Sequence, residues 1–324
     1  MKHFLAFLLS TICFSGIIAA AEPIQASEPL SPETKGYILV GKAIPEAKHI
    51  GLHYDALQRD FFRNAGFDYS EHPHCTGIGG HMDGEHLAVV HDETLNKPVL
   101  RFDIHITPVT DGDRCSGTDR QRNELKTTHT DRNWAQLLNG QLGKWQILEW
   151  KMKIPKGFQP TQAFCHIHQI KAQDGPNNGA PVITLTLRSN RDGSNSRVQV
   201  IHASSGGSGR SLGTLTEIPL SEFEDEWVQV VQETHFRHNG FYSIKITRIR
   251  DGKVLLTTEK NDIDMYRRGA TVMRSKYGIY RSLAGGDLRN NPVRLSPLLK
   301  NESIYMCDFM IYEKNAPNRT SGER

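Results

Sequence analysis

The sequence predicts an all-β fold in which two antiparallel sheets pack as a sandwich or jelly roll. Short segments rich in β-branched and aromatic residues follow one another closely from Val99 onward. Turn sequences such as Asn239-Gly240 and Asp251-Gly252 separate these segments. No long stretch shows helical periodicity, and no internal repeat stands out. Many short strands at close spacing are typical of a β-sandwich or jelly roll.

The strand pattern is clearest in residues 182–188, where Ile183, Leu185 and Leu187 share one face and polar residues the other. Residues 37–95 hold few periodic runs, and we expect loops there with short strands or a helix. Strands are predicted over residues 122–126, 165–171, 182–188, 227–232, 241–248, 253–258, 276–282 and 303–312.

The N-terminus has the features of a secretory signal peptide. Lys2 precedes an apolar run over residues 4–18, and small residues end it at Ala21. The run is too short to span a bilayer and no stop-transfer pattern follows, so a membrane anchor is the weaker alternative. We expect a secreted protein, extracellular or periplasmic, that acts as a monomer without a membrane partner.

The chain divides into four parts on this basis. Residues 1–21 form the signal peptide, and residues 22–36 form a proline-containing flexible lead-in. Residues 37–314 form one β-jelly-roll domain, in the manner of a concanavalin-like sandwich, and residues 315–324 form a disordered tail.

Four cysteines remain once Cys13 leaves with the signal peptide, which suggests one or two disulfides in an oxidising compartment. Three pairings are possible, and we favour Cys75–Cys115 and Cys165–Cys307. No C-x2-C or H-x3-H pair accompanies these cysteines, so we expect no structural zinc and no metal ligands.

The formal net charge of the whole chain is only +3, which argues against a general basic field for nucleic acid. Attraction for a polyanion must then come from local placement of Arg, Lys and His. We expect no required cofactor. Asp111 and Asp113 could hold a structural Ca²⁺, although Asp-Gly-Asp is more often a turn.

Three predicted strands carry polar groups that should lie on single faces, because side chains two residues apart in a strand point the same way. Side by side on a curved sheet, these faces would form a cationic surface around one ionised carboxylate, that of Glu124. The residues are Arg122, Glu124 and Lys126 in the first segment, His166 and His168 in the second, and Lys276, Gly278 and Tyr280 in the third.

Each segment alone has a simpler interpretation. Arg-x-Glu-x-Lys is commonly an exposed ladder of ion pairs. His-x-His can be a metal pair or part of a solvated face. Lys-x-Gly-x-Tyr can be a strand with an aromatic anchor. Their occurrence together, in this order, is much more specific.

Together the segments resemble the signature strands of the alginate lyases of polysaccharide lyase family 7 and the related glucuronan lyases. Those families carry Arg-x-Glu-Leu-Arg, Gln-Ile-His and Lys-Ala-Gly-x-Tyr-Asn-Gln, whereas this chain has Arg122-Asn-Glu-Leu-Lys126, His166-Ile-His168 and Lys276-Tyr-Gly-Ile-Tyr-Arg-Ser282. The resemblance implies a jelly-roll lyase acting on an acidic polysaccharide. The departures at Lys126, His166 and Arg281-Ser282 favour glucuronan over alginate as the substrate.

The resemblance also implies a mechanism of β-elimination on a uronate. Arg122 and His166 would neutralise the uronate carboxylate, because that group resists further negative charge when the C5 proton leaves. His168 or Tyr280 would take this proton, and Tyr280 would protonate the departing O4. Residues expected to bind the substrate are Glu124, Lys126, Gln169, Arg188, Lys276 and Arg281.

Other functions remain open at this point. A noncatalytic jelly roll that binds acidic glycans would use the same cationic face, and a lyase similar to heparin lyase I would act on a glycosaminoglycan. A glycoside hydrolase would need two carboxylates flanking the bond, yet the acidic cluster at residues 222–226 looks like a loop before Trp227. The sequence does not choose the polyuronate, or endo against exo action.

Overall fold

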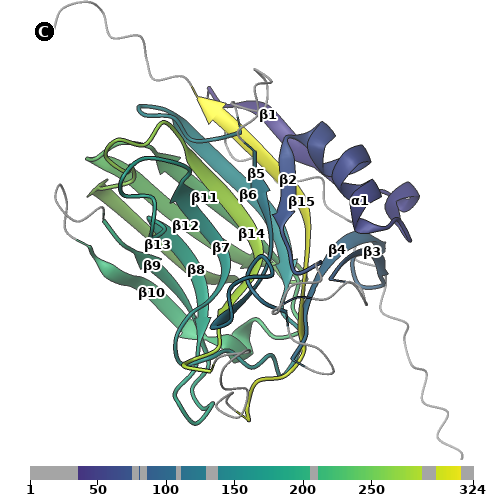
Figure 1. Cartoon of the computed structure of the whole chain (residues 1–324). Helices are drawn as coiled ribbons and strands as arrows, with labels where there is room; N and C mark the ends of the chain where they lie inside the picture. Colours follow the sequence, from purple (N-terminus) through teal and green to yellow (C-terminus); the bar gives the residue numbers. More distant parts are fainter. Residues whose placement is uncertain are drawn as a thin grey trace, which may run out of the picture.

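The computed structural model describes residues 36–74, 80, 86–106, 111–128, 138–204, 211–286 and 297–314. It contains two antiparallel sheets that lie one over the other (Figure 1). The predicted all-β sandwich of two antiparallel sheets is therefore confirmed. The signal peptide, all of the lead-in except Gly36, and the tail from residue 315 lie outside the described residues.

The first sheet has the strand order β13-β12-β11-β6-β15-β4-β3, and β1 pairs with β15 beside this path. Its longest strand is the last one in the chain, which pairs with β1, β4 and β6. The strands are β1 (Ile38–Ala43), β3 (Leu87–Asp92), β4 (Lys97–Ile104), β6 (Trp145–Lys153), β11 (Val228–His235), β12 (Gly240–Arg248), β13 (Val254–Ile263) and β15 (Glu302–Lys314).

The second sheet has the order β10-β9-β8-β7-β14-β5-β2. The three segments predicted to carry chemistry lie on its adjacent strands β7, β14 and β5, although they are far apart in the sequence. The strands are β2 (Phe67–Glu71), β5 (Arg120–Thr127), β7 (Cys165–Ala172), β8 (Ile183–Arg188), β9 (Arg197–His202), β10 (Gly213–Pro219) and β14 (Met273–Ser282).

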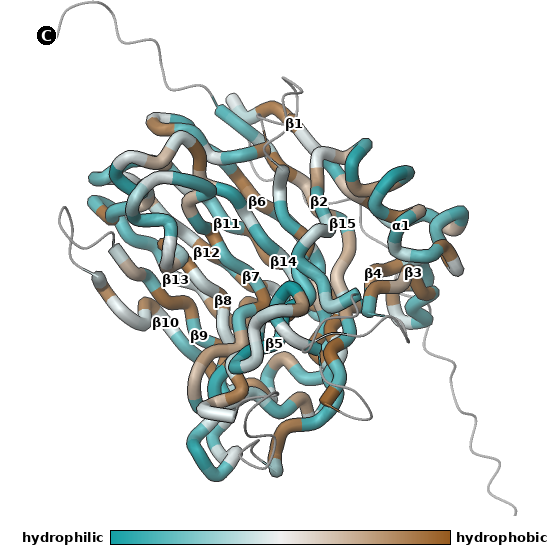
Figure 2. Tube along the Cα trace, viewed as in Figure 1, coloured by the Kyte–Doolittle hydropathy of each residue, from teal (hydrophilic) through white to brown (hydrophobic). Residues whose placement is uncertain are grey.

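One large hydrophobic core fills the space between the sheets. The Tyr277 ring on β14 lies 5.2 Å from the Trp150 ring on β6 and 4.9 Å from the Phe309 ring on β15. Along several strands, apolar and polar residues alternate (Figure 2), as expected when one face is buried. We call the face of the second sheet that packs on this core its inner face, and the opposite face its outer face.

The segment over residues 37–95 contains β1, β2, β3 and a short helical stretch that lies beside β2 (Figure 1). Phe61 and Phe62 from this stretch are buried in the main core. No helix in the described part of the chain is long and apolar enough to cross a membrane. The helical elements are η1 (Ala47–His49), α1 (Tyr54–Ala56), η2 (Leu57–Phe62), η3 (Arg63–Ala65) and η4 (Leu220–Glu222).

The predicted Cys165–Cys307 disulfide is wrong, because both cysteines are free and buried. Cys165 belongs to the core between the sheets. Cys307 packs in a separate cluster with Val99 and Trp227, so the two thiols point into different parts of the molecule. Cys75 lies outside the described residues, and the Cys75–Cys115 pair stays a prediction.

Candidate active site

The predicted polar residues of β5 and β14 lie opposite one another on the outer face. In the register of these strands, Lys276 pairs with Lys126, and Tyr280 pairs with Arg122. On the other side of β14, Tyr280 pairs with His166 of β7. The structure therefore brings Tyr280 between Arg122 and His166, side chains that are 44 residues apart in the sequence.

Gly278 allows β14 and β5 to approach closely at the middle of this arrangement. Its φ of +135° is one that L side chains rarely adopt. A Cβ atom there would lie 2.2 Å from the backbone oxygen of Asn123 and 2.9 Å from Cα of Glu124. The glycine between Lys276 and Tyr280 is thus required by strand packing.

Two cations surround Tyr280. The Arg122 guanidinium carbon lies 3.8 Å from the centre of the Tyr280 ring, and Arg120 donates a hydrogen bond of 3.0 Å to the phenol oxygen. Phe164 packs against the same ring at 4.9 Å and stacks on His166 at 4.8 Å. These contacts fix the ring and place positive charge beside it.

Arg122 is itself held by carboxylates. Its Nη1 lies 2.9 Å from Glu71 Oε2, and its Nε and Nη2 lie 2.8 and 3.1 Å from the two oxygens of Asp113. This two-point pairing with Asp113 fixes the plane of the guanidinium. Arg122 therefore has a defined orientation beneath the Tyr280 ring.

Glu71, on β2, is the anion at the centre of the cationic surface. Its carboxylate bonds to Lys276 and Arg122, and its Oε1 lies 3.4 Å from Lys126 and 3.7 Å from Arg274. Burial opposes its ionisation, but Lys276, Lys126 and Arg122 outweigh this effect, so the pKa of Glu71 lies below its ordinary value. Glu71 stays ionised and keeps four cations together.

Glu124 is the second buried anion, and it orients Gln169. Its side chain is fully buried and accepts a hydrogen bond from the Gln169 amide. Its other oxygen lies 3.5 Å from Lys276 Nζ and 3.6 Å from Arg122 Nη1. The proposed substrate residues Glu124, Gln169 and Lys276 are thus brought together, but their polar groups are largely satisfied by one another.

His166 and Arg188 also have polar atoms without a hydrogen-bond partner, as Arg122 Nε and Glu124 Oε2 do, but neither forms an ion pair in the described part of the chain. Burial, together with the charges of Arg188, Arg122 and Lys276, lowers the pKa of His166 to about 3, so the ring is neutral at pH 7. Its Nδ1 and the Nε of Arg188 are buried and have no hydrogen-bond partner within the described ranges. The unmet Nδ1 of His166, which pairs with Tyr280 in the strand register, indicates a place for a ligand.

Lys171 adds to the positive charge of the outer face. Burial and the charges of Lys276, Arg274 and Arg122 lower the pKa of Lys171 to about 8. Its ammonium group donates to the backbone oxygen of Gly179 at 3.0 Å. Lys171 therefore lies among several like charges on this face.

The expectation that His166 and His168 share a face is wrong. His168 is fully buried on the inner face, where its ring lies 4.5 Å from Trp150 and 4.8 Å from Tyr277. Its Nε2 lies 2.7 Å from Gln232 Nε2. The pairing of β7 shifts register between His166 and His168, and this irregularity breaks the period of two.

Arg281 also lies away from the proposed substrate. It follows Tyr280 directly, so it points to the opposite face, where it is fully buried. Its guanidinium donates to the side-chain oxygen of Gln121 and, at 3.1 Å, to the backbone oxygen of Lys300. The expected role of Arg281 in substrate binding is therefore wrong.

Asp111 and Asp113, expected together as possible Ca²⁺ ligands, have different partners. Asp113 pairs with Arg122, whereas Asp111 Oδ1 lies 2.9 Å from His86 Nε2 and its Oδ2 lies 3.2 Å from His105 Nδ1. The Asp111 carboxylate therefore belongs to a separate cluster, whereas the Asp113 carboxylate supports the outer face.

Sequence reasoning missed Arg120 and Glu71. A signal for Arg120 was present, since the period of two that joins Arg122 to Lys126 also extends back to Arg120. Glu71 had no comparable signal, because β2 is only five residues long and follows a helical stretch.

The chain matches no protein-family model, and a comparison with curated protein sequences finds no match. Among solved structures, it is similar to an endo-β-1,4-glucuronan lyase from Trichoderma reesei, with 12% identity and a TM-score of 0.47 over 85% of this chain and 95% of that chain. It is also similar to the PL-14 alginate lyase of Aplysia kurodai, with 10% identity and a TM-score of 0.49 over 85% and 98% of the two chains. An alginate lyase from Klebsiella pneumoniae gives 12% identity and 0.49 over 72% and 85%. Similarities of this degree identify no activity for the present chain.

Proposed function

We propose that this protein is a secreted polysaccharide lyase that cleaves a β-1,4-linked polyuronate by β-elimination. Glucuronan is the favoured substrate and alginate the next. The observation that carries the proposal is the group around Tyr280: Arg120 on its oxygen, Arg122 beneath its ring, and the neutral His166 at its side. The features of a signal peptide at the N-terminus support secretion.

The first requirement of this reaction is a partner for the uronate carboxylate, which must accept charge when the C5 proton leaves. We assign this role to His166 and Arg188, because each has a buried nitrogen without a hydrogen-bond partner in the described part of the chain and, unlike Arg122, neither forms an ion pair there. Arg122 was the first candidate. Its Nε also lacks a hydrogen bond, but it lies 2.8 Å from Asp113 Oδ1, and its other two nitrogens donate to Glu71 and Asp113. We therefore assign Arg122 to positioning Tyr280.

The second requirement is a base for the C5 proton and an acid for O4. His168 lies on the inner face, so Tyr280 is left to serve as both. Its phenolate oxygen takes the C5 proton, the C5–H electrons form the C4–C5 double bond, the C4–O4 bond breaks, and the same phenol then protonates O4. One group suffices when C5–H and O4 lie on the same side of the ring, as in β-1,4-linked glucuronate and mannuronate.

A hydrolase is the less supported alternative on the same face. Hydrolysis needs one carboxylic acid and one carboxylate beside the glycosidic bond. Glu71 and Glu124 on this face are buried, and both pair with Lys276 and Arg122. Neither is placed to meet a sugar ring.

The test is a panel of glucuronan, alginate, heparin, hyaluronan and pectate, with ultraviolet absorbance of the unsaturated product as the readout. We expect product from glucuronan first, and none from carboxyl-reduced glucuronan, which offers no acidic C5 proton. The Tyr280→Phe variant serves as the matched control. Binding without any product would indicate a glycan-binding protein, and saturated new ends would indicate hydrolysis; both results would contradict the proposal.

A further inference from the structure

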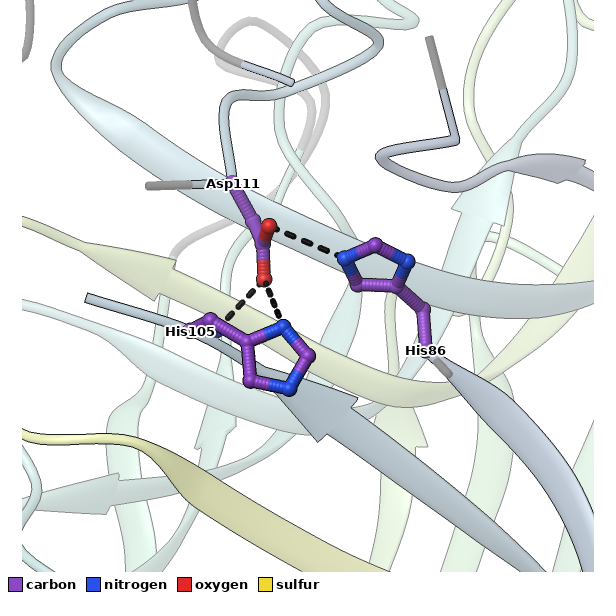
Figure 3. A group of neighbouring side chains, drawn as sticks. All are labelled: His86, His105 and Asp111. Atoms are coloured by element: carbon purple, nitrogen blue, oxygen red, sulfur yellow. Dashed lines mark hydrogen bonds and ion pairs between the residues drawn. The ribbon is translucent and has the colours of Figure 1, made fainter. Parts of the chain in front are cut away.

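A second group of polar side chains lies away from Tyr280, where β3 begins and β4 ends. His86 immediately precedes β3, His105 immediately follows β4, and Asp111 comes from the segment that leads to β5. Figure 3 shows the two imidazole rings turned toward one carboxylate. Asp111 Oδ1 lies 2.9 Å from His86 Nε2, and Oδ2 lies 3.2 Å from His105 Nδ1.

The backbone holds these three residues in place. The inner-face amide of Asn123 donates to the backbone oxygen of His86, and that of Gln121 donates to the backbone oxygen of His105 at 2.8 Å. Asp111 accepts a hydrogen bond from the backbone N–H of His105, and its own N–H donates to the oxygen of His105 at 3.2 Å. β5 and the β3–β4 hairpin thus fix the positions of all three side chains.

The geometry of the group fits a small divalent ion. One ligand atom from each residue lies within 4.8 Å of the other two. Tetrahedral zinc, with bonds of about 2.0–2.1 Å to nitrogen and oxygen, holds its ligand atoms roughly 3.3 Å apart. The two contacts of 2.9 and 3.2 Å are close to that spacing, so small side-chain movements would admit an ion.

The chemistry of the ligands selects the class of ion. Two imidazoles and one carboxylate suit zinc and neighbouring transition metals, whereas Ca²⁺ and Mg²⁺ prefer oxygen ligands. His86 and Asp111 are fully buried, and the His105 side chain is 22% exposed, so an ion can enter beside His105. Three protein ligands leave one position for a further donor.

We propose that His86, His105 and Asp111 bind a divalent transition metal of the zinc class. The ion has a structural role, because it joins the β3–β4 hairpin of the first sheet to the segment entering β5 of the second. It would lie behind β5, on the side of Asn123, whereas Arg122 and Tyr280 lie on the outer face. The site is independent of the proposed lyase activity.

The test uses the full chain without a histidine tag, treated with a chelator and then titrated with Zn²⁺ in a calorimeter. We expect one Zn²⁺ per chain and a Tm that rises with free Zn²⁺, since an ion that binds only the folded state stabilises it by mass action. Co²⁺ in place of zinc should give the visible absorption of a site with nitrogen and oxygen ligands. Ca²⁺ should leave the Tm unchanged.

His105→Gln is the main variant, because this partly exposed side chain can be replaced with the least damage to folding. It should weaken Zn²⁺ binding at least tenfold. His238→Gln is the matched control: His238 also lies 3.0 Å from a carboxylate, that of Asp264, but belongs to no three-residue group among the described residues, and its variant should bind as the wild type does. Wild-type protein that takes up no Zn²⁺, or equal affinity in His105→Gln, would overturn the proposal and show that Asp111 only accepts hydrogen bonds from the two rings.

Discussion

On the outer face of the second sheet, Tyr280 lies among charged groups, whereas on the inner face His168 and Tyr277 pack in the core. Both faces therefore carry the residue types that proton transfer needs. The environments differ: Arg120 and Arg122 place positive charge beside the outer tyrosine, and the inner one has Trp150 and Phe309 as neighbours. Residue type alone does not make a catalytic group; the charges beside it do.

The pKa values on the two faces show the same difference. Burial raises the pKa of the Tyr277 phenol above its ordinary value, and a hydrogen bond with Ser275 offsets the loss of water only in part. Burial alone also lowers the pKa of His168 to about 3, whereas for His166 three cations add to the effect of burial. A substrate carboxylate would therefore meet positive charge beside His166, where Arg188, Arg122 and Lys276 lie.

The largest expected effect is on turnover, and it distinguishes Tyr280 on the outer face from Tyr277 on the inner face. Tyr280→Phe removes the phenolic oxygen but keeps the ring, so turnover should fall about 10³-fold or more while the free energy of unfolding changes little. Tyr277→Phe, the control on the inner face, should keep wild-type turnover. The rate of product formation measures turnover in both variants, and thermal unfolding measures their stability. Normal turnover in Tyr280→Phe would remove Tyr280 from the mechanism.

The second prediction concerns the anion that holds the outer face together. Glu71→Gln leaves Lys276 and Arg122 buried beside a neutral amide, and breaking such buried pairs typically costs about 3 kcal/mol or more. We expect a marked fall in the free energy of unfolding by chemical denaturation. Asp68→Asn is the control, because among the described residues Asp68 forms one ion pair, with Lys126 at 3.4 Å, and is more exposed. Its hydrogen bonds from Gln58 and Ser70 are with neutral groups, so the change in stability should be less than about 1 kcal/mol. Equal effects would mean that Glu71 is not the central anion.

The period of two predicted the outer-face residues of β5 and β14 well, since these strands pair in unbroken register from Lys276 to Ser282. It failed on β7, where the register shift near His166 turns His168 inward. Such irregularities depend on how neighbouring strands pack, and a single strand's sequence carries little sign of them. The expectation for Arg281 failed for a simpler reason, because the same period already placed it opposite Tyr280.

The remaining features could not be predicted from the sequence, because they depend on contacts between segments that are far apart in the chain. The Cys165–Cys307 pairing was one of the alternatives that the sequence could not distinguish, and the two thiols occupy different clusters. Glu71 comes from a short strand without periodicity. The group of His86, His105 and Asp111 joins three segments through the pairing of β3 with β4, so no spacing rule for metal ligands could find it.

The third prediction contrasts the effects of replacing His166 and His168 on turnover and on stability. His166→Ala removes a neutral hydrogen-bonding group beside Tyr280, and turnover should fall about 10²-fold with little change in stability. His168→Ala removes packing against Trp150 and Tyr277, so stability should fall by about 2–3 kcal/mol while the folded fraction keeps its turnover. Steady-state kinetics below each variant's Tm separate the two effects. Loss of turnover in folded His168→Ala would show that the inner histidine takes part after all.

The last prediction concerns the pH dependence of stability. The folded-state pKa of His168, about 3, lies below the value of about 6.5 in an unfolded chain. Between these values the unfolded state binds a proton that the folded state does not, so stability is lost as the pH falls from about 6.5 toward 3. One such group contributes about 1.4 kcal/mol per pH unit in the middle of this window. His168→Gln removes that contribution, and its free energy of unfolding should fall less steeply between pH 6 and 4 than that of the wild type.

His53→Gln is the control, because His53 lies on the surface with a side chain that is 67% exposed. The slope of its free energy of unfolding against pH should match that of the wild type. Equal slopes in the wild type and His168→Gln would mean that the ring is not held neutral in the core.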